Sequence, residues 1–428
     1  AFCEGREGVS LGRMWADGEL MDTSDVTFRF YDGSETQEPD PLIQSIEGSS
    51  EVSAYRGTAY VVFEDLALAK YGNRIPQITA ELNVPLLEEG TMETLIESVN
   101  LIPSTGEQAY GVTPAFRESG GEVVFSNTNL NSEKSDFVIS MEQLRAGLPN
   151  TDSLNLVISW FGTDLRLGSC RVLPKVEFYP SLGDSAFGQI LIGGLYGVKG
   201  NQDEDTWDVS GVTRATAQRV SYDPDGNPYF GGTPTDWSVA ECIQHTMDVE
   251  DMGVHFYPFI LMDIPPNNSL PNIDGVGSSQ PAFPWRGRMY TSTPSVDQTS
   301  DAADEMDAFF GNVTLSDFTV TVVDGIPLPI YTGLAVDFGY RRMVLHYALL
   351  CALAASESQN PQNLKTFYVG TELVGINRVR DENGVYVGTA HLNTLIDEVR
   401  ALFDSYGLTD TEVSYAADWS EYHSHQDG

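Results

Sequence analysis

The chain has 428 residues, with 62 Asp and Glu against 23 Lys and Arg, and its formal net charge is −39 at pH 7. A surface this acidic repels phosphate, which excludes the wrapping of nucleic acid and docking on anionic lipid. The length predicts two or three domains, and a hydrophobic content of 41% is enough for ordinary cores.

The cysteines and the chain ends indicate what else to expect. Cys3, Cys170, Cys242 and Cys351 lie far apart without the spacing of a metal site, so we expect buried thiols, no metal and no cofactor. No apolar run approaches the roughly 18 residues that a membrane span needs. The chain begins without Met and stops soon after a predicted strand, so we expect it to be part of a longer polypeptide.

Residues 1–150 are predicted to form a β-rich, mixed α+β region. Val26, Phe28 and Phe30 alternate with polar residues, which is typical of a half-buried strand, and a hairpin-type turn precedes them at 16–18. Further strands are predicted at 59–63 and 78–84. The region contains no Ser/His/Asp or Cys/His constellation, so we interpret it as a binding or assembly module.

Residues 151–428 change to a βα rhythm. Apolar strands are predicted at 154–161, 254–262, 367–369 and 413–417, and helices at 236–247, 300–310, 343–354 and 392–403. Strands that alternate with helices form parallel sheets, which predicts part of an α/β TIM-like barrel. Two inserted segments are expected, at 171–235 and at 313–332, and the second is predicted to be a hairpin across Asp324-Gly325.

An acidic residue follows each of the four predicted strands: Asp164, Asp263, Glu372 and Asp418. The carboxyl ends of parallel strands meet on one rim of a barrel, so these acids are expected to converge there, as a hydrolase or a divalent-metal site requires. Each acid taken alone could equally be a helix cap or a loop acceptor.

Glycoside hydrolysis needs two carboxyl groups that flank the scissile bond. Glu372 is the candidate acid/base, because it directly follows an apolar strand where partial burial would favour its protonated form. Candidates for substrate binding are Asp164, Asp263, Trp285, Asp418 and Trp419, in which the indoles would offer flat faces to sugar rings. Arg286 and Arg288 would hold an anionic group or neutralise the acidic rim.

The chain resembles the large baseplate hub proteins, sometimes called megatron proteins, of gene transfer agents and related siphophage tails. The resemblance rests on long runs across nearly the whole chain. In the first part these are CEG (3–5), WADG (15–18), AYRGTAYVVFEDL (54–66) and YGNRIPQ (71–77). In the second part they are SWFGTDLR (159–166), FYPFILMD (256–263), QPAFPWRGR (280–288) and YAADWSEY (415–422).

The resemblance implies a virion structural protein at the distal end of a tail. It implies a homotrimer around the tail axis, contacts with other baseplate and tail-tip proteins, and a glycosidase-like TIM barrel directed toward a host envelope glycan. In that family the acid/base Glu of a retaining glycosidase-like barrel follows the fourth strand, which Glu372 matches. The nucleophile would come from a later strand, beyond residue 428, so the barrel is expected to be incomplete here. The alternative is an active glycoside hydrolase that degrades cell-wall or surface polysaccharide with Glu372 as acid/base.

Overall fold

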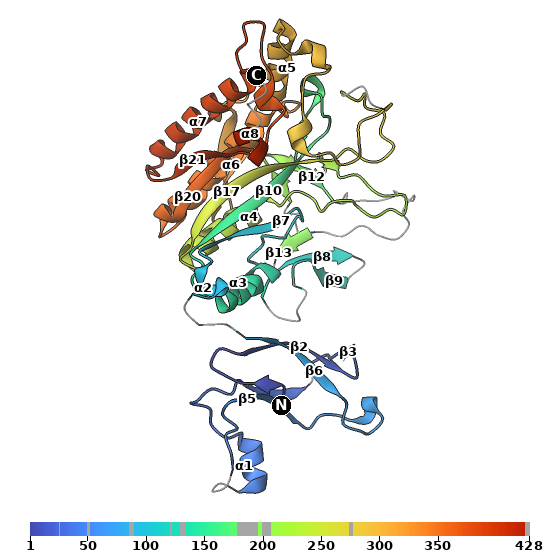
Figure 1. Ribbon diagram of the computed structural model, residues 1–428, viewed down its shortest axis with the longest axis vertical. Helices are drawn as coiled ribbons and strands as arrows, with labels where there is room; N and C mark the ends of the chain where they lie inside the picture. The colour runs from blue at the N-terminus through green and yellow to red at the C-terminus, as the bar shows by residue number, and fades with distance from the viewer. Residues whose placement is uncertain are drawn as a thin grey trace. The chain divides into compact units, whose positions relative to one another are not determined.

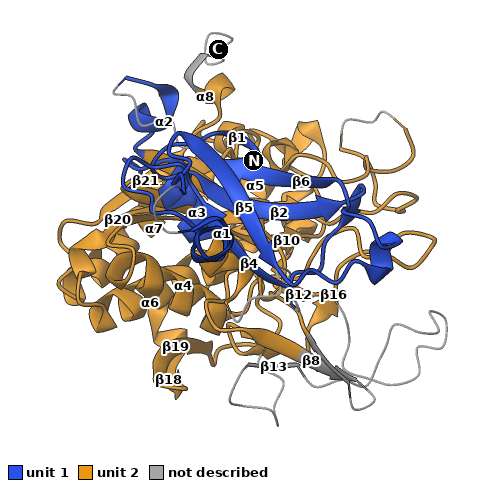
Figure 2. Ribbon diagram, turned by 90° about the horizontal axis from the view of Figure 1, so that it is seen from below, with its two compact units in different colours: residues 1–97, 140–151 blue, residues 98–139, 152–428 orange. Residues whose placement is uncertain are grey.

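The computed structural model describes residues 1–24, 26–48, 52–84, 90–119, 122–128, 134–177, 196–198, 207–273 and 277–423. The chain divides into two units (Figure 2). The first comprises residues 1–97 and 140–151, and the second comprises residues 98–139 and 152–428. The division runs through α3 (Asp136–Gly147) and places 98–139 with the second unit.

The first unit contains two small antiparallel sheets. One has the order β1 (Cys3–Glu4), β5 (Thr58–Glu64), β4 (Thr27–Tyr31), and the other β3 (Glu19–Leu20), β2 (Ser10–Ala16), β6 (Ile78–Asn83). The strands predicted around Phe28, at 59–63 and at 78–84 are therefore confirmed. Asp17 and Gly18 have φ values of 55° and 87°, so the predicted two-residue turn joins β2 to β3.

Small helices and a limited core complete this unit. The core is built on Met14, Ala16 and Met21. The helices are α1 (Pro41–Glu47) and α2 (Met92–Leu95). Asp40 caps α1 by accepting from the backbone N–H groups of residues 42 and 43, and it also accepts a 2.7 Å ion-pair bond from Arg29. Arg29 thereby fastens α1 to β4.

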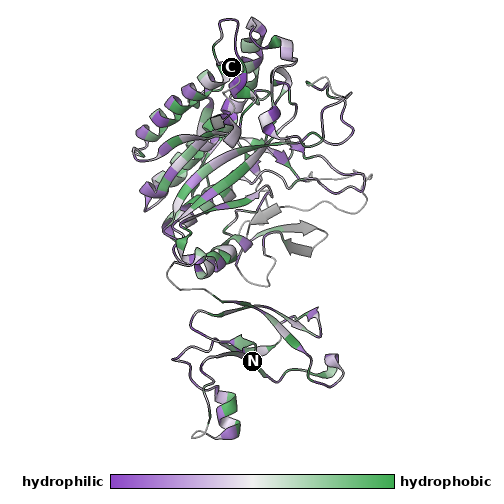
Figure 3. Cartoon of the chain, in the orientation of Figure 1, coloured by the Kyte–Doolittle hydropathy of each residue, from purple (hydrophilic) through white to green (hydrophobic). Residues whose placement is uncertain are grey.

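The second unit is organised around one parallel sheet (Figure 1). Its parallel strands follow the order β7 (Ser98–Ser104), β10 (Ser153–Gly162), β17 (Gly253–Met262), β20 (Leu364–Thr371), β21 (Glu412–Ala416). The short strand β11 (Val172–Leu173) pairs antiparallel with the end of β10. Hydrophobic residues concentrate on these strands (Figure 3), and β10 is buried over nearly its whole length. The four predicted parallel strands are confirmed, whereas the fifth, β7, was missed.

Helices cover one face of the sheet. They are α4 (Asp236–Asp248), α6 (Tyr340–Glu357) and α7 (Val387–Ser405), with α5 (Ser300–Phe310) and the short α8 (Trp419–His423) near the strand ends (Figure 1). All four predicted helices are confirmed. Phe256 of β17 and Phe367 of β20 stack with ring centroids 5.9 Å apart, and Phe403 of α7 meets Phe367 at 5.8 Å. This aromatic layer fixes the helices on the sheet.

Side chains alternate along β17. Residues 254, 256, 258, 260 and 262 are buried on the helix side, and residues 255, 257, 259 and 261 are half-buried on the other face. The second set includes Tyr257 and Phe259. Tyr257 also meets Tyr368 of β20, with ring centroids 4.9 Å apart. On β17 and β20, the face opposite α6 and α7 is therefore lined by aromatic side chains.

The inserted segment 171–235 is described in part, since residues 178–195 and 199–206 lie outside the described residues. Its short strands are β12 (Lys175–Val176) paired with β16 (Gln218–Arg219), and β14 (Asp208–Val209) paired with β15 (Val212–Thr213). β13 (Tyr196–Val198) pairs with β8 (Ala115–Ser119), which pairs with β9 (Glu122–Phe125). The predicted hairpin is confirmed as β18 (Phe318–Val323) and β19 (Ile326–Tyr331).

Thr235 is the N-cap residue of α4. The carboxylate of Asp236, the first residue of the helix, pairs at 2.8 Å with Nε2 of buried His346. The buried-thiol prediction holds for Cys170, Cys242 and Cys351, whereas Cys3 is only partly buried. Among the described residues, no helix has the length and hydrophobicity to cross a bilayer.

Candidate functional site at the strand ends

The register of the sheet places the four acidic residues on one edge. Gly162 of β10 is opposite Met262 of β17, and Thr371 of β20 is opposite Ala416 of β21. Asp164, Asp263, Glu372 and Asp418 follow these strand ends by one or two residues. The four acids therefore lie along the carboxyl edge of the sheet, as predicted. The four side chains nevertheless have different environments there.

Asp164 and Asp263 are buried and tied to basic partners. Asp164 is 3% exposed and accepts from Arg166 at 2.7 Å and from Nε2 of Gln280 at 2.7 Å. The Asp263 side chain is fully buried and pairs with Nζ of Lys175 at 2.7 Å. Both carboxylates are acceptors inside closed networks, an arrangement that fixes loops after strands.

Asp418 caps the short helix α8. Its Oδ1 accepts the backbone N–H of Ser420 at 2.9 Å. Hydrogen bonds from the Ser420 hydroxyl and from this N–H hold the pKa of the Asp418 carboxyl below its usual value. Trp419 follows it and is 74% exposed. The helix-cap alternative raised by the sequence therefore describes Asp418.

Glu372 is the one of the four acids that is hydrogen-bonded to Trp285, a predicted substrate-binding residue. Nε1 of Trp285 and Nη2 of Arg286 both donate to its Oε2, at 2.8 Å and 2.7 Å. The Glu372 side chain is 35% exposed and Trp285 is 41% exposed. The backbone of Glu372 has φ of 50°, in the left-handed region, and its N–H donates to the carbonyl of Ala416. A non-glycine residue costs of order 1 kcal/mol in that conformation, and such residues concentrate at functional sites.

Arg286, the second donor to Glu372, is buried and held by several contacts. It is 5% exposed, its Nε donates to the Thr371 carbonyl at 2.8 Å, and its guanidinium lies 3.7 Å from the ring centre of Phe259. Burial lowers its pKa, while the Glu372 carboxylate acts in the opposite direction. Nη2 of Arg286 also donates to the Thr371 hydroxyl, which in turn donates to Tyr257. The chain of contacts connects Glu372 to the aromatic face of the sheet.

Close glycine contacts bring the two loops together. A Cβ at Gly287 would lie 2.5 Å from the Trp285 ring, and a Cβ at Gly375 would lie 2.0 Å from the carbonyl oxygen of Met289. The N–H of Gly375 donates to the carbonyl of Gly287 at 2.9 Å. Only glycine permits this approach of the two backbones. It positions Trp285 over the loop that follows Glu372.

A second network beside Glu372 was not predicted. The Tyr415 hydroxyl accepts from the N–H of Leu373 at 2.7 Å and from Nδ2 of Asn377 at 2.9 Å, and it donates to Glu421 at 2.9 Å. Burial, with the Glu421 charge beside it, raises the pKa of Tyr415 well above its usual value. Glu421 thus has a positioning role for the loop after β20. Strand periodicity alone gave no signal for this contact.

The rim presents a carboxylate and an indole that are both partly exposed. Oε2 of Glu372 accepts from Trp285 and Arg286, and these two bonds fix the orientation of the carboxylate. The exposed indole of Trp285 beside a fixed carboxylate offers a stacking face and a hydrogen-bond acceptor, which is the chemistry that holds a sugar ring. Among the described residues, no group of three or more His, Cys, Asp or Glu side chains is arranged to hold a metal ion.

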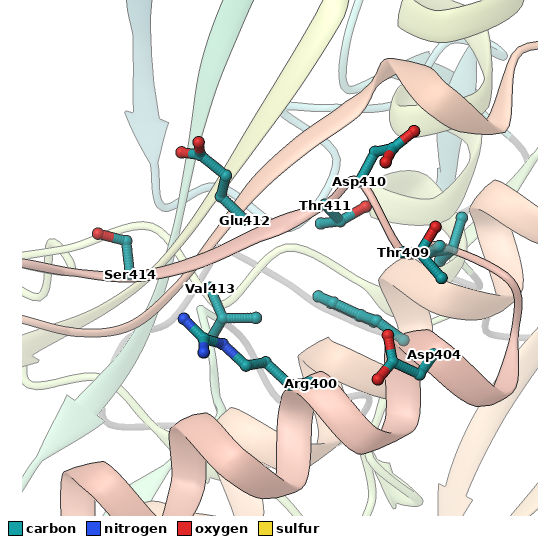
Figure 4. Close-up of a pocket in the computed structure, with 10 residues that line it drawn as sticks. Arg400, Asp404, Thr409, Asp410, Thr411, Glu412, Val413 and Ser414 are labelled. Atoms are coloured by element: carbon teal, nitrogen blue, oxygen red, sulfur yellow. The ribbon is translucent and has the colours of Figure 1, made fainter.

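A pocket of about 430 Å³ lies at the other end of β21. Figure 4 shows Arg400 and Asp404 of α7 facing the segment from Thr409 to Ser414 that leads into the strand. This pocket is at the amino end of β21, whereas the four acids follow the carboxyl ends. It is therefore separate from the candidate site.

Comparisons with known proteins match parts of the chain. No curated protein matches the chain. A chain of a solved structure described as "Virion of native gene transfer agent (GTA) particle" is 42% identical over 24% of this chain and 24% of that chain, with a TM-score of 0.19. The match thus spans about a quarter of the length of each chain. Residues 338–428, which contain α6, β20, Glu372 and β21, match the family "GTA TIM-barrel-like domain", and the predicted resemblance to gene transfer agent proteins is confirmed over that segment.

Proposed function

We propose that the chain is a structural component of a phage-like tail tip, a baseplate hub that closes the tail tube. The match of residues 338–428 to a GTA TIM-barrel-like domain supports an origin in a gene transfer agent particle. The β-built first unit suits assembly with other tail proteins, and three copies would surround the tail axis. In this proposal the second unit is directed at the host envelope, where its rim contacts glycan.

The glycan-binding part of the proposal rests on the environments of the four acidic residues at the strand ends. Hydrolysis requires a second carboxylate opposite Glu372 across the scissile bond. Asp164 and Asp263 are enclosed in buried ion pairs, and Asp418 caps a helix. Glu372 and Trp285 together form a partly exposed acceptor and stacking surface. The described residues therefore support binding of an envelope polysaccharide better than they support its cleavage.

The location is tested by labelling. Gold-labelled antibodies against the first unit should mark the distal end of the tail in intact particles, viewed by electron microscopy. An antibody against the major capsid protein serves as the positional control. Label on the capsid or on the tail shaft, with none at the tip, would refute the hub role.

The glycan-binding role is tested with the full-length protein. We expect Trp285→Ala to weaken retention of host envelope polysaccharide about tenfold, because an aromatic stacking surface is lost. Tyr55→Ala removes another exposed aromatic residue, from the first unit, and should change retention little. Reducing ends are assayed in the same samples. Their release by the wild-type protein and not by Glu372→Gln would contradict the proposal and establish the hydrolase alternative.

A further inference from the structure

The hairpin β18–β19 has two edges of different character. It lies at the margin of the second unit beside α6 (Figure 2). Its turn residues Asp324 and Gly325 have φ values of 49° and 87°, and Val323 is opposite Ile326. This is a two-residue turn of the kind that fixes hairpin register. The direction of every backbone N–H along the ladder can therefore be assigned.

One hydrogen bond sets that assignment. The N–H of Thr332 donates to the carbonyl of Asp317 at 2.8 Å, so positions 317 and 332 form a hydrogen-bonded pair. Hydrogen-bonded and non-hydrogen-bonded pairs alternate along an antiparallel ladder. The N–H and C=O groups of residues 318, 320 and 322 in β18 therefore point away from β19, and those of 327, 329 and 331 in β19 point away from β18.

The outer edge of β19 is closed to another strand. Two of its three outward positions are Pro327 and Pro329, which have no N–H to donate. At the third, the turn between β14 and β15 approaches so closely that a Cβ on Gly211 would lie 3.1 Å from the carbonyl oxygen of Tyr331. Proline and a covering loop are the usual protections of a sheet edge.

The outer edge of β18 has neither protection. Residues 319–323 are exposed, with Val320 at 49% and Val322 at 65%. The strand contains no proline and no charged residue, and no other described strand pairs with its outer side. An exposed, β-branched, uncharged edge is a template for strand addition. Phe318 anchors the strand at its base, where it is 8% exposed and its ring centroid is 5.4 Å from that of Tyr331.

The charges around the outer edge of β18 indicate which kind of binding partner fits it. If the β18 edges of two copies paired antiparallel, Asp317 of one copy would lie beside Asp324 of the other, and like charges that face each other across two strands are destabilising. Asp317 and Asp324 bracket β18 at its two ends. We propose that the outer edge of β18 binds an extended segment of a partner protein by strand addition, and that this segment is β-branched in its middle and basic at its ends.

A peptide of matching chemistry tests the proposal on the full chain. The probe is fluorescein-labelled Lys-Thr-Val-Thr-Val-Thr-Lys, and binding is followed by fluorescence anisotropy. Val320→Pro removes one outward N–H, leaves the hairpin's own ladder donors in place, and should weaken binding about tenfold or more. Val320→Thr keeps the N–H and should stay within about threefold of wild type. Exchanging both Lys for Glu in the probe should abolish binding, because the acidic bracket then repels it.

The outcomes that overturn the proposal are distinct. Equal affinity of the wild type and Val320→Pro would place the peptide elsewhere, and no binding to the wild type would exclude this occupant. Dimerisation of the chain in analytical ultracentrifugation that disappears in Val320→Pro would show a second copy as the occupant instead. A lower melting temperature of Val320→Pro would mean that the variant is destabilised. In that case the deciding comparison is between the unmodified probe and a probe N-methylated at every residue, both tested on the wild type. That probe cannot pair on either edge, and its binding as tightly as the unmodified probe would also refute strand addition.

Discussion

Replacing Lys175 with Met should lower the free energy of unfolding of the second unit by about 3–5 kcal/mol. The Lys175 ammonium and the Asp263 carboxylate are 2.7 Å apart, and their side chains are 8% and 0% exposed. The substitution keeps most of the side-chain volume but leaves Asp263 charged, buried and without its cation. Desolvation of that unpaired charge is the source of the loss. The measurement is urea unfolding of the full chain, followed by circular dichroism and analysed for the transition of the second unit.

Two further variants test whether the loss of stability comes from the buried ion pair. Lys365→Met is the same chemical change at an exposed position of the same sheet and should leave the transition nearly unchanged. Lys175→Met combined with Asp263→Leu removes both charges and should recover at least half of the loss. If the double variant is as unstable as the single one, the stabilisation comes from the shape of Lys175 and not from its charge.

The second large effect is a pH dependence centred on Asp208. Burial, with the Asp236 carboxylate nearby, raises the pKa of Asp208 to about 7, while the N–H of Gly211 and the Arg342 guanidinium act in the opposite direction. The folded protein then holds a proton on Asp208 that the unfolded chain releases near pH 4. The stabilisation is complete below pH 4 and is lost as the pH rises through about 7.

Asp208→Asn should remove this dependence. Between pH 4 and pH 7 we expect the free energy of unfolding of the wild type to fall by about 1–3 kcal/mol relative to the variant. Asp324→Asn, in the exposed turn of the β18–β19 hairpin, is the control and should follow the wild type. The check is a series of urea titrations across that pH range. Parallel curves for the wild type and Asp208→Asn would show that Asp208 does not take up the proton.

The elements that the sequence predicted are those with strong local periodicity. The runs 154–161 and 254–262 are nearly continuous apolar segments, and each became a strand of the parallel sheet. β7 was missed because Asn100 and Pro103 interrupt a seven-residue segment with only three aliphatic residues. Its pairing with β10 makes it a strand, and such a tertiary contact has no local signature.

The sequence predicted which residues lie at the candidate site better than it predicted the contacts between them. The position of Glu372 after a strand, and of the other acids on the same edge, followed from chain order. The contacts between loops did not follow from chain order. Trp285 donates to Glu372, which lies 87 residues later in the sequence, and Gln280 donates to Asp164, which lies 116 residues earlier. The same holds for Phe259, which belongs to a predicted strand and also supports the Arg286 guanidinium. Close glycine contacts such as that of Gly375 could have indicated which backbones approach, because only glycine fits there.

The pairing of β7 with β10 bears on how the second unit can be produced in isolation. Tyr110 fixes that pairing, since its hydroxyl donates to the carbonyl of Val157 at 2.6 Å and contacts that of Leu101 at 3.2 Å. An expression fragment that starts at residue 151 would lack both β7 and Tyr110 and would present the bare amide row of β10 to other molecules. Such a fragment should accumulate in inclusion bodies, whereas one that starts at residue 98 retains the first strand of the sheet.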